Sequence, residues 1–532
     1  MRGLLGGHLF PINSENPTNE KHHVARDSLS NSCIDTVHSN MAQVISADYL
    51  VVGAGAMGMA FVDTLLSDTK ATAAIVDRYH RPGGHWNLAY PFVRLHQPSS
   101  FYGVNSKPLG RGTIDKVGWN KGLQELATSD QIDTYYSQVL DDTFLPSERV
   151  QYFANCEYDG DGAFHSLVTG KAFRVTEATR VVDATYLQVV VPAMRRPSYE
   201  VNGAQCITPN DLVKISRPFN NYTIVGAGKT GIDACLWLLK AGVQPSQITW
   251  IMPRDSWLLD RAAFQTGEEF VERNRAFIQN QAEAVMAADS VEDLFLRLEK
   301  CGHLLRLSDK VWPKMYHCAT VSVAEFEQLK SIENVVRMGR VKSISLGQIV
   351  LDDGILATDQ DTLYIDCSAE GLTKATPVPV FNGNKITLQS VRQCQQVFSA
   401  AFIAHIEAAY DDDKVKNALC QPIPHPNDWL DWLRVSMLNQ QNALRWNQEP
   451  GLVQWLRGSR LDWFGKLQSA AHGHIEPGSE EQAALASMVQ MVIKKLEQLL
   501  AEIPDGPAVE ERQTVQDVVP SFRQRAKLAR LA

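Results

Sequence analysis

Three glycines with the spacing G-x-G-x-x-G are the first residues of this sequence whose types and positions predict a chemistry: Gly53, Gly55 and Gly58. The first glycine of such a turn permits a sharp bend, the second lets the backbone approach a diphosphate, and the third lets a helix pack closely on the preceding strand. An acid about 20 residues further on accepts hydrogen bonds from ribose hydroxyls, and Asp77 stands in that place. The pattern therefore predicts an adenine dinucleotide site.

A second turn repeats this spacing later in the chain, with Gly226, Gly228 and Gly231. Its second strand ends without an acid, and Arg254 follows instead. A cation in this place suits the 2′-phosphate of NADPH, whereas an acid would bind the free 2′-hydroxyl of NAD. Asp255 follows Arg254 directly and leaves NADH open as the alternative. Lys229, inside the turn, is a candidate for adding charge against the phosphates, with a solvated side chain as the alternative, and we predict an NADPH site here.

The segment Gly83-Gly84-His85-Trp86 follows the acidic strand end, and here the chain resembles the flavin-containing and Baeyer–Villiger monooxygenases. In these families the FAD domain continues from the acidic strand end into a G-G-x-W segment. The resemblance implies that the first turn binds FAD, with Gly84 and Trp86 lining the flavin site. A glycine turn beside a core tryptophan is the structural alternative.

Three polar side chains follow a few residues later: Arg94, His96 and Gln97. The same resemblance implies that this stretch brings polar groups to the isoalloxazine ring, and His96 and Gln97 are the candidates for hydrogen bonds to it. Arg94 could complement negative charge on reduced flavin or on a peroxide. These three are the candidate catalytic residues, and a loop held by its own polar contacts is the alternative for each.

Two nucleotide sites in one chain resemble the two-dinucleotide-binding flavoproteins, in which late strands complete the FAD domain after the NADPH domain is inserted. The resemblance implies that residues 365–371 form the returning strand, with Asp366 as a cofactor-binding residue, and that residues 183–186 form the crossing between domains. The F-x-G-x-x-x-H-x-x-x-[WYF] fingerprint of class B flavin monooxygenases is absent, because only Gly203 matches it before the second turn. We therefore expect an outlying branch, whose substrate does not follow by analogy.

The elements that must position these residues are two strand–turn–helix–strand units of an α/β fold. Their strands are nearly continuous apolar runs, as is typical of parallel strands buried on both faces. These strands are predicted at residues 48–52, 73–77, 222–225 and 248–251. Residues 83–125 are predicted to be a long ordered loop region, and short strands at 150–154, 164–168 and 172–176 to be an antiparallel excursion.

We therefore predict two Rossmann-like dinucleotide-binding domains, one for FAD and one for NADPH, with an additional, mostly helical C-terminal region that includes an amphipathic helix near residues 479–502. The predicted boundaries are residues 1–45 for a disordered N-terminal extension, 46–200 for the first part of the FAD domain, 201–355 for the NADPH domain, 356–410 for the return of the FAD domain, and 411–532 for the helical region.

Composition excludes several classes of protein for this 532-residue chain. A net charge of -9 argues against binding to nucleic acid, which needs a basic face. Nine cysteines are scattered without a C-x-x-C pair, which predicts buried thiols, a reducing and therefore cytoplasmic location, and no dithiol redox centre. No apolar run is long enough to predict a transmembrane helix. The pair His472 and His474 lacks further ligands nearby, so no metal site is predicted.

Together these observations predict an FAD-dependent oxidoreductase that takes hydride from NADPH and acts as a monooxygenase, with oxygen and a small organic molecule as substrates. One alternative is an NADPH oxidoreductase without oxygen insertion. The other is a non-enzymatic nucleotide-binding sensor of redox state.

Overall fold

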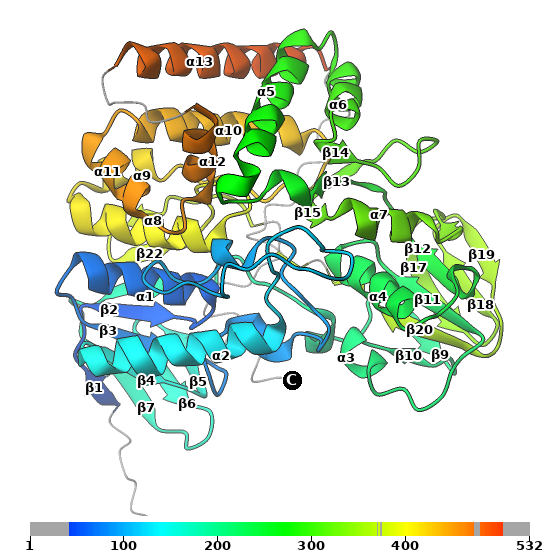
Figure 1. Ribbon diagram of the computed structural model, residues 1–532. Coiled ribbons are helices and arrows are strands. Elements are labelled where there is room, and N and C mark those ends of the chain that lie inside the picture. Colours follow the sequence, from blue (N-terminus) through cyan, green and yellow to red (C-terminus); the bar gives the residue numbers. More distant parts are fainter. Residues whose placement is uncertain (1–41, 370, 373–374, 473–478, 504–532) are drawn as a thin grey trace, which may run out of the picture. The chain divides into compact units, whose positions relative to one another are not determined.

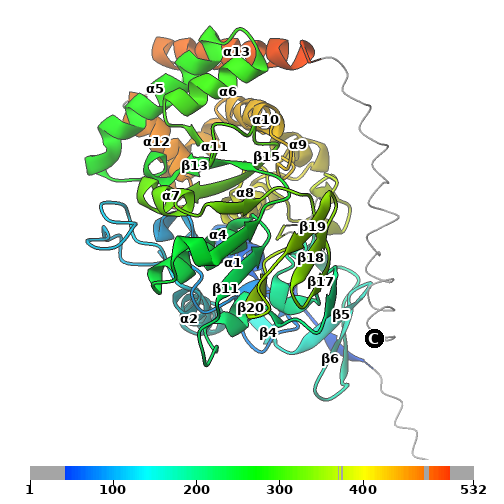
Figure 2. The ribbon, with the colours of Figure 1, turned by 90° about the vertical axis from the view of Figure 1, so that its right-hand side faces the viewer.

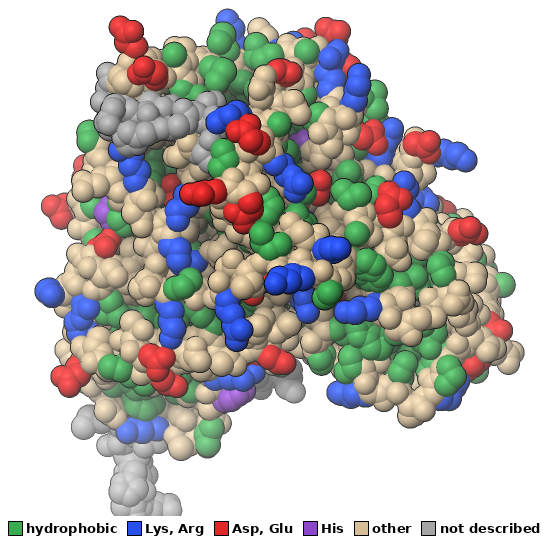
Figure 3. All heavy atoms as spheres, in the orientation of Figure 1, with side chains coloured by type: hydrophobic (Ala, Val, Ile, Leu, Met, Phe, Trp, Pro, Cys, Tyr) green, Lys and Arg blue, Asp and Glu red, His purple; other side chains and the backbone are tan. Residues whose placement is uncertain are grey.

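The structure is a computed structural model of the chain, and it describes residues 42–503 apart from 370, 373–374 and 473–478. Two parallel sheets, each at the base of a glycine turn, and a group of helices make up this part of the chain (Figure 1, Figure 2). Among the described residues, no helix combines the length and apolarity that crossing a membrane requires. On the face drawn in Figure 3, acidic and basic side chains are interspersed.

The first sheet has a doubly wound strand order. Its strands, in spatial order, are β21 (Phe381–Asn382), β22 (Lys385–Thr387), β8 (Arg180–Asp183), β2 (Tyr49–Val52), β3 (Ala73–Val76) and β4 (Val150–Phe153). All neighbours from β22 to β4 are parallel. The chain starts in the middle at β2, extends to one side through β3 and β4, and then crosses to β8, so the topological switch point lies between β2 and β8.

Different layers cover the two faces of this sheet. On one face Val51, Ile75 and Val182 pack in one core with helices α1 (Ala56–Asp68), α2 (Ser129–Val139) and α8 (Gln396–Ala409). On the other face Leu50 and Val76 pack against a small sheet, which consists of β1 (Gln43–Ile45), β5 (Cys156–Gly160), β6 (Ala163–Ser166) and β7 (Ala172–Val175). Because side chains alternate along a strand, each buried strand serves both cores.

The second sheet repeats this arrangement. It consists of β10 (Cys206–Ile207), β20 (Thr362–Asp366), β11 (Asn221–Val225), β12 (Ile248–Ile251) and β16 (Asn334–Val336), all parallel. Helices α4 (Lys229–Lys240) and α7 (Val323–Lys330) pack on one face. The other face is covered by the sheet of β9 (Glu200–Asn202), β17 (Val341–Ser345), β18 (Gln348–Leu351) and β19 (Gly354–Ala357).

The predicted return strand is wrong. The strand that ends in Asp366, β20, pairs with β10 and β11 in the second sheet, and the first sheet is completed instead by β22. The boundary predicted at residue 356 therefore lies too early, because residues 362–366 still belong to the second sheet. The sequence identifies this segment as a buried parallel strand that ends in an acid, but it does not identify the sheet that the strand joins.

Two smaller expectations are also corrected. Residues 43–45 were included in the disordered extension, but they form β1 and pair with β7, while residues 1–41 lie outside the described part. The strand predicted at 150–154 is not part of an antiparallel excursion, because β4 pairs parallel to β3 in the first sheet. Only β5, β6 and β7 form antiparallel pairs there.

The helical part draws on two distant segments of the chain. The predicted C-terminal helices are present as α10 (Asp431–Trp446), α11 (Pro450–Gly458), α12 (Trp463–His472) and α13 (Glu480–Ala501). Helix α5 (Val271–Ala287) contacts α12 and α13, although it is inserted in the sequence of the second domain. A three-stranded sheet of β13 (Ser256–Asp260), β14 (Leu304–Leu305) and β15 (Met315–Val321) joins the same core as α5, α10 and α13.

Candidate functional site

The first glycine turn has the geometry of an anion-binding helix start. Gly53 has a φ of 102°, and a Cβ atom on Gly58 would lie 2.0 Å from the carbonyl oxygen of Gly53. Gly55 is the N-cap of α1, and no side chain caps the N–H groups of the first helical turn. These N–H groups and the positive end of the helix dipole are therefore available to a phosphate.

Asp77 and the Gly83–Gly84 loop surround this turn. The carboxylate of Asp77 accepts hydrogen bonds from the backbone N–H groups of Ala54 (2.6 Å) and Tyr79 (2.7 Å). Burial raises the pKa of Asp77, and these two N–H groups oppose the rise. A Cβ atom on Gly84 would lie 2.9 Å from the Cα atom of Gly55, so only glycine lets this loop lie on the turn.

Trp86 packs into the core beside this loop. Its side chain is buried, and its indole N–H donates to the hydroxyl of Tyr102 at 2.8 Å. Trp86 therefore anchors the Gly83–Gly84 loop on the first domain.

The second glycine turn repeats the first and is more open. Gly226 has a φ of 116°, and a Cβ atom on Gly231 would lie 2.1 Å from the carbonyl oxygen of Gly226. Gly228 is the N-cap of α4, again without a side-chain cap. A Cβ atom on Gly228 would meet nothing within 4 Å, so open space lies directly above the second glycine of the turn.

In each sheet, the strand that lies beside the strand before the glycine turn ends in an acid. This strand is β8 in the first sheet, beside β2, and β20 in the second, beside β11. Asp183 pairs with Val52 beside the first turn, and Asp366 pairs with Val225 beside the second. One oxygen of Asp183 accepts the hydroxyl of Thr185 at 2.8 Å, and one oxygen of Asp366 accepts the hydroxyl of Ser368 at 2.6 Å.

Asp366 therefore belongs to the second turn and corresponds to Asp183, which corrects its expected place in the FAD domain. The sequence signal for this pairing is the repeated D-x-[ST] after a buried strand, as in Asp183-Ala184-Thr185 and Asp366-Cys367-Ser368.

Charged side chains gather where β12 ends. The guanidinium of Arg254 donates to the side-chain carbonyl of Asn427 at 3.3 Å. Asp255 is buried, and both of its oxygens accept hydrogen bonds from Arg337, at 2.7 and 2.9 Å. Asp255, the acid that left NADH open as the alternative, thus has its charge neutralised by Arg337, which the sequence did not indicate. Arg337 directly follows β16, the neighbour of β12, and the carboxyl ends of parallel strands meet at one edge of a sheet.

The segment around residue 90 joins the two turns. Tyr90 donates its hydroxyl to Asp233 of α4 at 2.7 Å, and Asp233 forms an ion pair with Lys229. Lys229 also donates to the backbone carbonyl of Arg94 at 3.2 Å, while the Arg94 side chain is exposed. The ammonium of Lys229, predicted to face phosphates, is therefore directed at Asp233 and at the first domain, and Phe92 packs against the cores of both domains.

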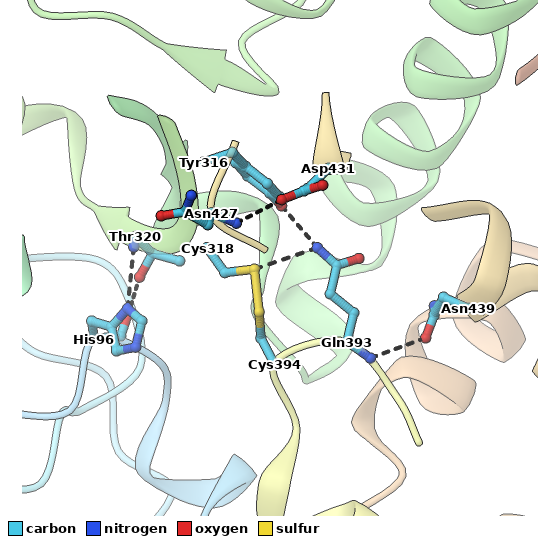
Figure 4. The surroundings of a disulfide bond; sticks show 9 residues. All are labelled: His96, Tyr316, Cys318, Thr320, Gln393, Cys394, Asn427, Asp431 and Asn439. Atoms are coloured by element: carbon cyan, nitrogen blue, oxygen red, sulfur yellow. Dashed lines mark hydrogen bonds between the residues drawn. A yellow bond between two sulfur atoms is a disulfide. The ribbon is translucent and has the colours of Figure 1, made fainter. Parts of the chain in front are cut away.

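His96 lies at the contact between the first domain and β15 (Figure 4). Its Nδ1 accepts the backbone N–H of Thr320 at 3.2 Å, and its carbonyl accepts the guanidinium of Arg261 at 2.9 Å. Burial, followed by the positive charges of Lys229 and Arg261, lowers the pKa of His96 to about 3. The ring is therefore neutral at physiological pH, and because Nδ1 accepts a hydrogen bond, Nε2 carries the proton.

A large cavity begins beside this histidine. It has a volume of about 1010 Å³, and Gln97 is part of its wall together with residues of β15 and the helices. Most of the wall is apolar, and its aromatic side chains include Phe264, Phe277, Tyr316, Trp432, Trp446 and Trp463.

The cavity wall also contains a disulfide bond between Cys318 and Cys394 (Figure 4). This corrects the expectation that the cysteines are buried thiols, because two of them are paired. The two residues are 76 positions apart and come from β15 and from the segment before α8, so no local pattern marks them as partners.

Comparisons with known proteins place the chain among uncharacterized relatives. No family model matches it. It is 51% identical over 456 residues to the uncharacterized protein Rv2000 of Mycobacterium tuberculosis, covering 86% of this chain and 83% of that protein. The uncharacterized protein Mb2023 of Mycobacterium bovis matches with the same values.

The solved structures that match the chain, at low identity, are flavin-containing and Baeyer–Villiger-type monooxygenases. An open crystal structure of cyclohexanone monooxygenase has a TM-score of 0.41 and 14% identity, covering 70% of this chain and 88% of that one. An oxidized steroid monooxygenase bound to NADP has a TM-score of 0.41 and 12% identity, covering 85% and 98%. A flavin-containing monooxygenase from Stenotrophomonas maltophilia has a TM-score of 0.40 and 12% identity, covering 70% of this chain and 99% of that one.

The side chains of His472 and His474, considered for a metal, lie outside the described part.

Proposed function

This chain belongs to the family of the uncharacterized mycobacterial proteins that it matches at 51% identity, and we propose that it is an FAD-dependent oxidoreductase, reduced by NADPH, that acts as a monooxygenase. The observation that carries the proposal is the repetition of one site in one chain. Each parallel sheet has a glycine turn, an uncapped helix start and an acid across the switch point. Two such sites suit two dinucleotides that exchange electrons.

The residues of the first turn fit FAD. The uncapped N–H groups after Gly55 suit the diphosphate, and each oxygen of Asp77 keeps a lone pair for a ribose hydroxyl beside the backbone hydrogen bond that it accepts. When bound, FAD supplies hydride acceptance and oxygen activation. The residues around the turn bind and orient it, with Gly84 lying against Gly55 and Trp86 holding the loop.

The residues of the second turn fit NADPH. Open space above Gly228 leaves room for a diphosphate at the backbone. Arg254 follows the second strand and supplies a cation for the 2′-phosphate. Arg337 holds both oxygens of Asp255, so this acid does not offer a free carboxylate to a ribose diol.

His96 and Gln97 are the proposed catalytic residues, and Arg94 is a third candidate. His96 holds a proton at Nε2, and because its pKa is about 3 the ring does not take up a second proton near neutral pH. It therefore serves as a fixed hydrogen-bond donor rather than a general acid or base. Gln97 lines the mostly apolar cavity, which suits an apolar organic substrate.

A visible absorption spectrum before and after anaerobic addition of NADPH tests the proposal. The purified protein is expected to be yellow, and NADPH is expected to bleach the flavin band. Gly55→Asp is expected to give colourless protein, because a carboxylate would repel the FAD diphosphate. A wild-type protein without flavin, or a flavin that excess NADPH never reduces, would contradict the proposed function.

Oxygen insertion is tested separately. With a true substrate, NADPH consumption is expected to exceed the hydrogen peroxide released. If all consumed NADPH returns as hydrogen peroxide with every apolar substrate tested, the monooxygenase part of the proposal is wrong and the oxidoreductase part stands.

A further inference from the structure

The disulfide between Cys318 and Cys394 joins two parts of the cavity wall. Cys318 lies within β15, in the sheet of β13, β14 and β15, and Cys394 lies between β22 of the first sheet and α8. Both residues line the cavity of about 1010 Å³. Cys318 is 4% exposed and Cys394 is partly exposed, so a reagent that enters the cavity meets Cys394 first.

The backbone is strained at both ends of this bond. Cys318 has a φ of 56° and Cys394 a φ of 55°. The other non-glycine residues with positive φ in the described part are acids or amides, namely Glu148, Asn155, Asp161 and Gln188. A left-handed conformation costs free energy for any residue with a Cβ atom, and it persists only where the surroundings hold it. Here the covalent bond joins two such residues directly, and cleavage would let both relax.

Gln393 is placed to favour cleavage of the disulfide with the sulfur of Cys318 as the leaving group. Its side-chain N–H₂ group donates to the hydroxyl of Tyr316 at 2.9 Å and lies 3.4 Å from the sulfur of Cys318 (Figure 4). Its backbone N–H donates to Asn439 at 3.3 Å, which holds the residue against α10. A donor beside one sulfur stabilises that sulfur as a thiolate, and a thiol with a better stabilised thiolate leaves faster in disulfide exchange.

We propose that Cys318–Cys394 is a reversible redox site that dithiols reach through the cavity, and that its state sets the shape of the cavity wall. A thiolate of the dithiol attacks the sulfur of Cys394, and the sulfur of Cys318 leaves as a thiolate beside Gln393. The second thiol of the dithiol then displaces Cys394 from the mixed disulfide. The dithiol is oxidised to a disulfide by two electrons, and Cys318 and Cys394 end as two thiols that carry its two protons.

The other described cysteines differ from this pair. Burial raises the pKa of five thiols, which makes them poor nucleophiles: Cys156, Cys206, Cys235, Cys367 and Cys420. Cys301 is a partly exposed free thiol that takes no part in the bond, and it serves as the control position. The proposal needs neither FAD nor NADPH, so its test is independent of the proposed function.

The test counts thiols in the full-length protein. Air-oxidised native protein is treated with dithiothreitol, then alkylated in denaturant, and the modified peptides are identified by mass. Two further alkylated residues, Cys318 and Cys394, are expected while the circular dichroism spectrum stays native. Cys394→Ser is expected to abolish this gain, and Cys301→Ser to keep it. A bond that dithiothreitol cleaves only in unfolded protein, or a protein that never forms the bond in air, would overturn the proposal.

Two further measurements test the mechanism and its consequence. Gln393→Leu is expected to slow reduction roughly two- to tenfold, as the loss of one hydrogen bond predicts, whereas Gln396→Leu on α8 is expected to leave the rate unchanged. Reduction is expected to weaken binding of the apolar dye anilinonaphthalene sulfonate by roughly threefold or more, because the wall is then less preorganised. Equal rates for both glutamine variants would refute the leaving-group role of Gln393, and equal dye affinity would refute the link to cavity shape.

Discussion

Gly228 and Gly231 are the same residue type in the same turn, yet different physical reasons require their missing side chains. A Cβ atom on Gly231 would collide with the carbonyl of Gly226 at 2.1 Å, so this glycine serves the fold. A Cβ atom on Gly228 would stand in open space, so the packing of the fold gives no reason for glycine there. A ligand that approaches the backbone would supply that reason.

This difference gives a matched pair of variants. Gly231→Ala is expected to lower the free energy of unfolding by about 3 kcal/mol, because the helix start must shift away from Gly226. Gly228→Ala is expected to leave that free energy within about 0.5 kcal/mol and to weaken NADPH binding at least about tenfold. Urea unfolding and titration of NADPH measure the two effects. If Gly228→Ala binds NADPH as well as the wild type, the open space is not the diphosphate site.

Two arginines near the end of β12 are expected to separate stability from specificity. Arg337→Ala leaves the Asp255 side chain, which is 5% exposed, without its ion-pair partner. It is expected to cost about 3–5 kcal/mol of unfolding free energy. Arg254→Ala is expected to change stability little and to weaken NADPH roughly ten- to hundredfold more than NADH, as the loss of one charge-assisted hydrogen bond predicts. Binding titrations with both nucleotides decide this, and an equal loss for both would remove Arg254 from its role.

At the scale of elements, local sequence was sufficient to predict the turns and their flanking strands, because buried parallel strands carry continuous apolar runs. Local sequence was not sufficient for features that depend on contacts between segments far apart in the chain. Strand β22 is only three residues long and has no period to detect, so the return was assigned to β20. Arg337 and the Cys318–Cys394 bond depend on which distant segments meet, and neither leaves a pattern along the chain.

The long loop after Trp86 shows how distant elements supply order. The guanidinium of Arg460, between α11 and α12, donates to the backbone carbonyls of Ser100 (2.6 Å), Tyr102 (2.9 Å) and Val104 (3.2 Å). Burial lowers the pKa of Arg460, and the fork of N–H groups reaches several carbonyls at once. The sequence predicted an ordered loop here, but the residue that orders it follows in the chain only after both sheets.

Arg460→Lys is therefore expected to destabilise the protein although it keeps the charge. An ammonium cannot reach three carbonyls in this arrangement, and the loss is expected to be about 2–4 kcal/mol of unfolding free energy. Arg457→Lys, at an exposed position on the neighbouring helix α11, is the control and is expected to stay within about 0.5 kcal/mol. Urea unfolding of both variants provides the comparison. Equal stability of the two would mean that the carbonyl contacts of Arg460 do not hold the loop.

At the scale of the whole described molecule, neutral histidines that are buried or half-buried occur in several regions rather than at one site. Burial lowers the pKa of His85 and His425 to about 4 and that of His96 and His303 to about 3. An unfolded histidine has a pKa of about 6.5. Below that pH the unfolded chain therefore binds protons that the folded chain does not, and stability is lost as the pH falls.

His303 allows this effect to be measured at one position. It is 5% exposed, stacks on Phe277 at 4.7 Å and accepts the indole N–H of Trp432 at 3.3 Å. His303→Gln keeps an acceptor but removes the titration, so the unfolding free energy of the wild type should approach that of the variant as pH falls below 6.5, by up to about 1.4 kcal/mol per pH unit. Buried carboxyls with raised pKa values, such as Asp63 and Asp233, act in the opposite direction, but they titrate in both proteins and cancel from the difference. Urea unfolding at several pH values between 7.5 and 5 provides the measurement, and a difference that does not change with pH would show that folding does not lower the pKa of His303.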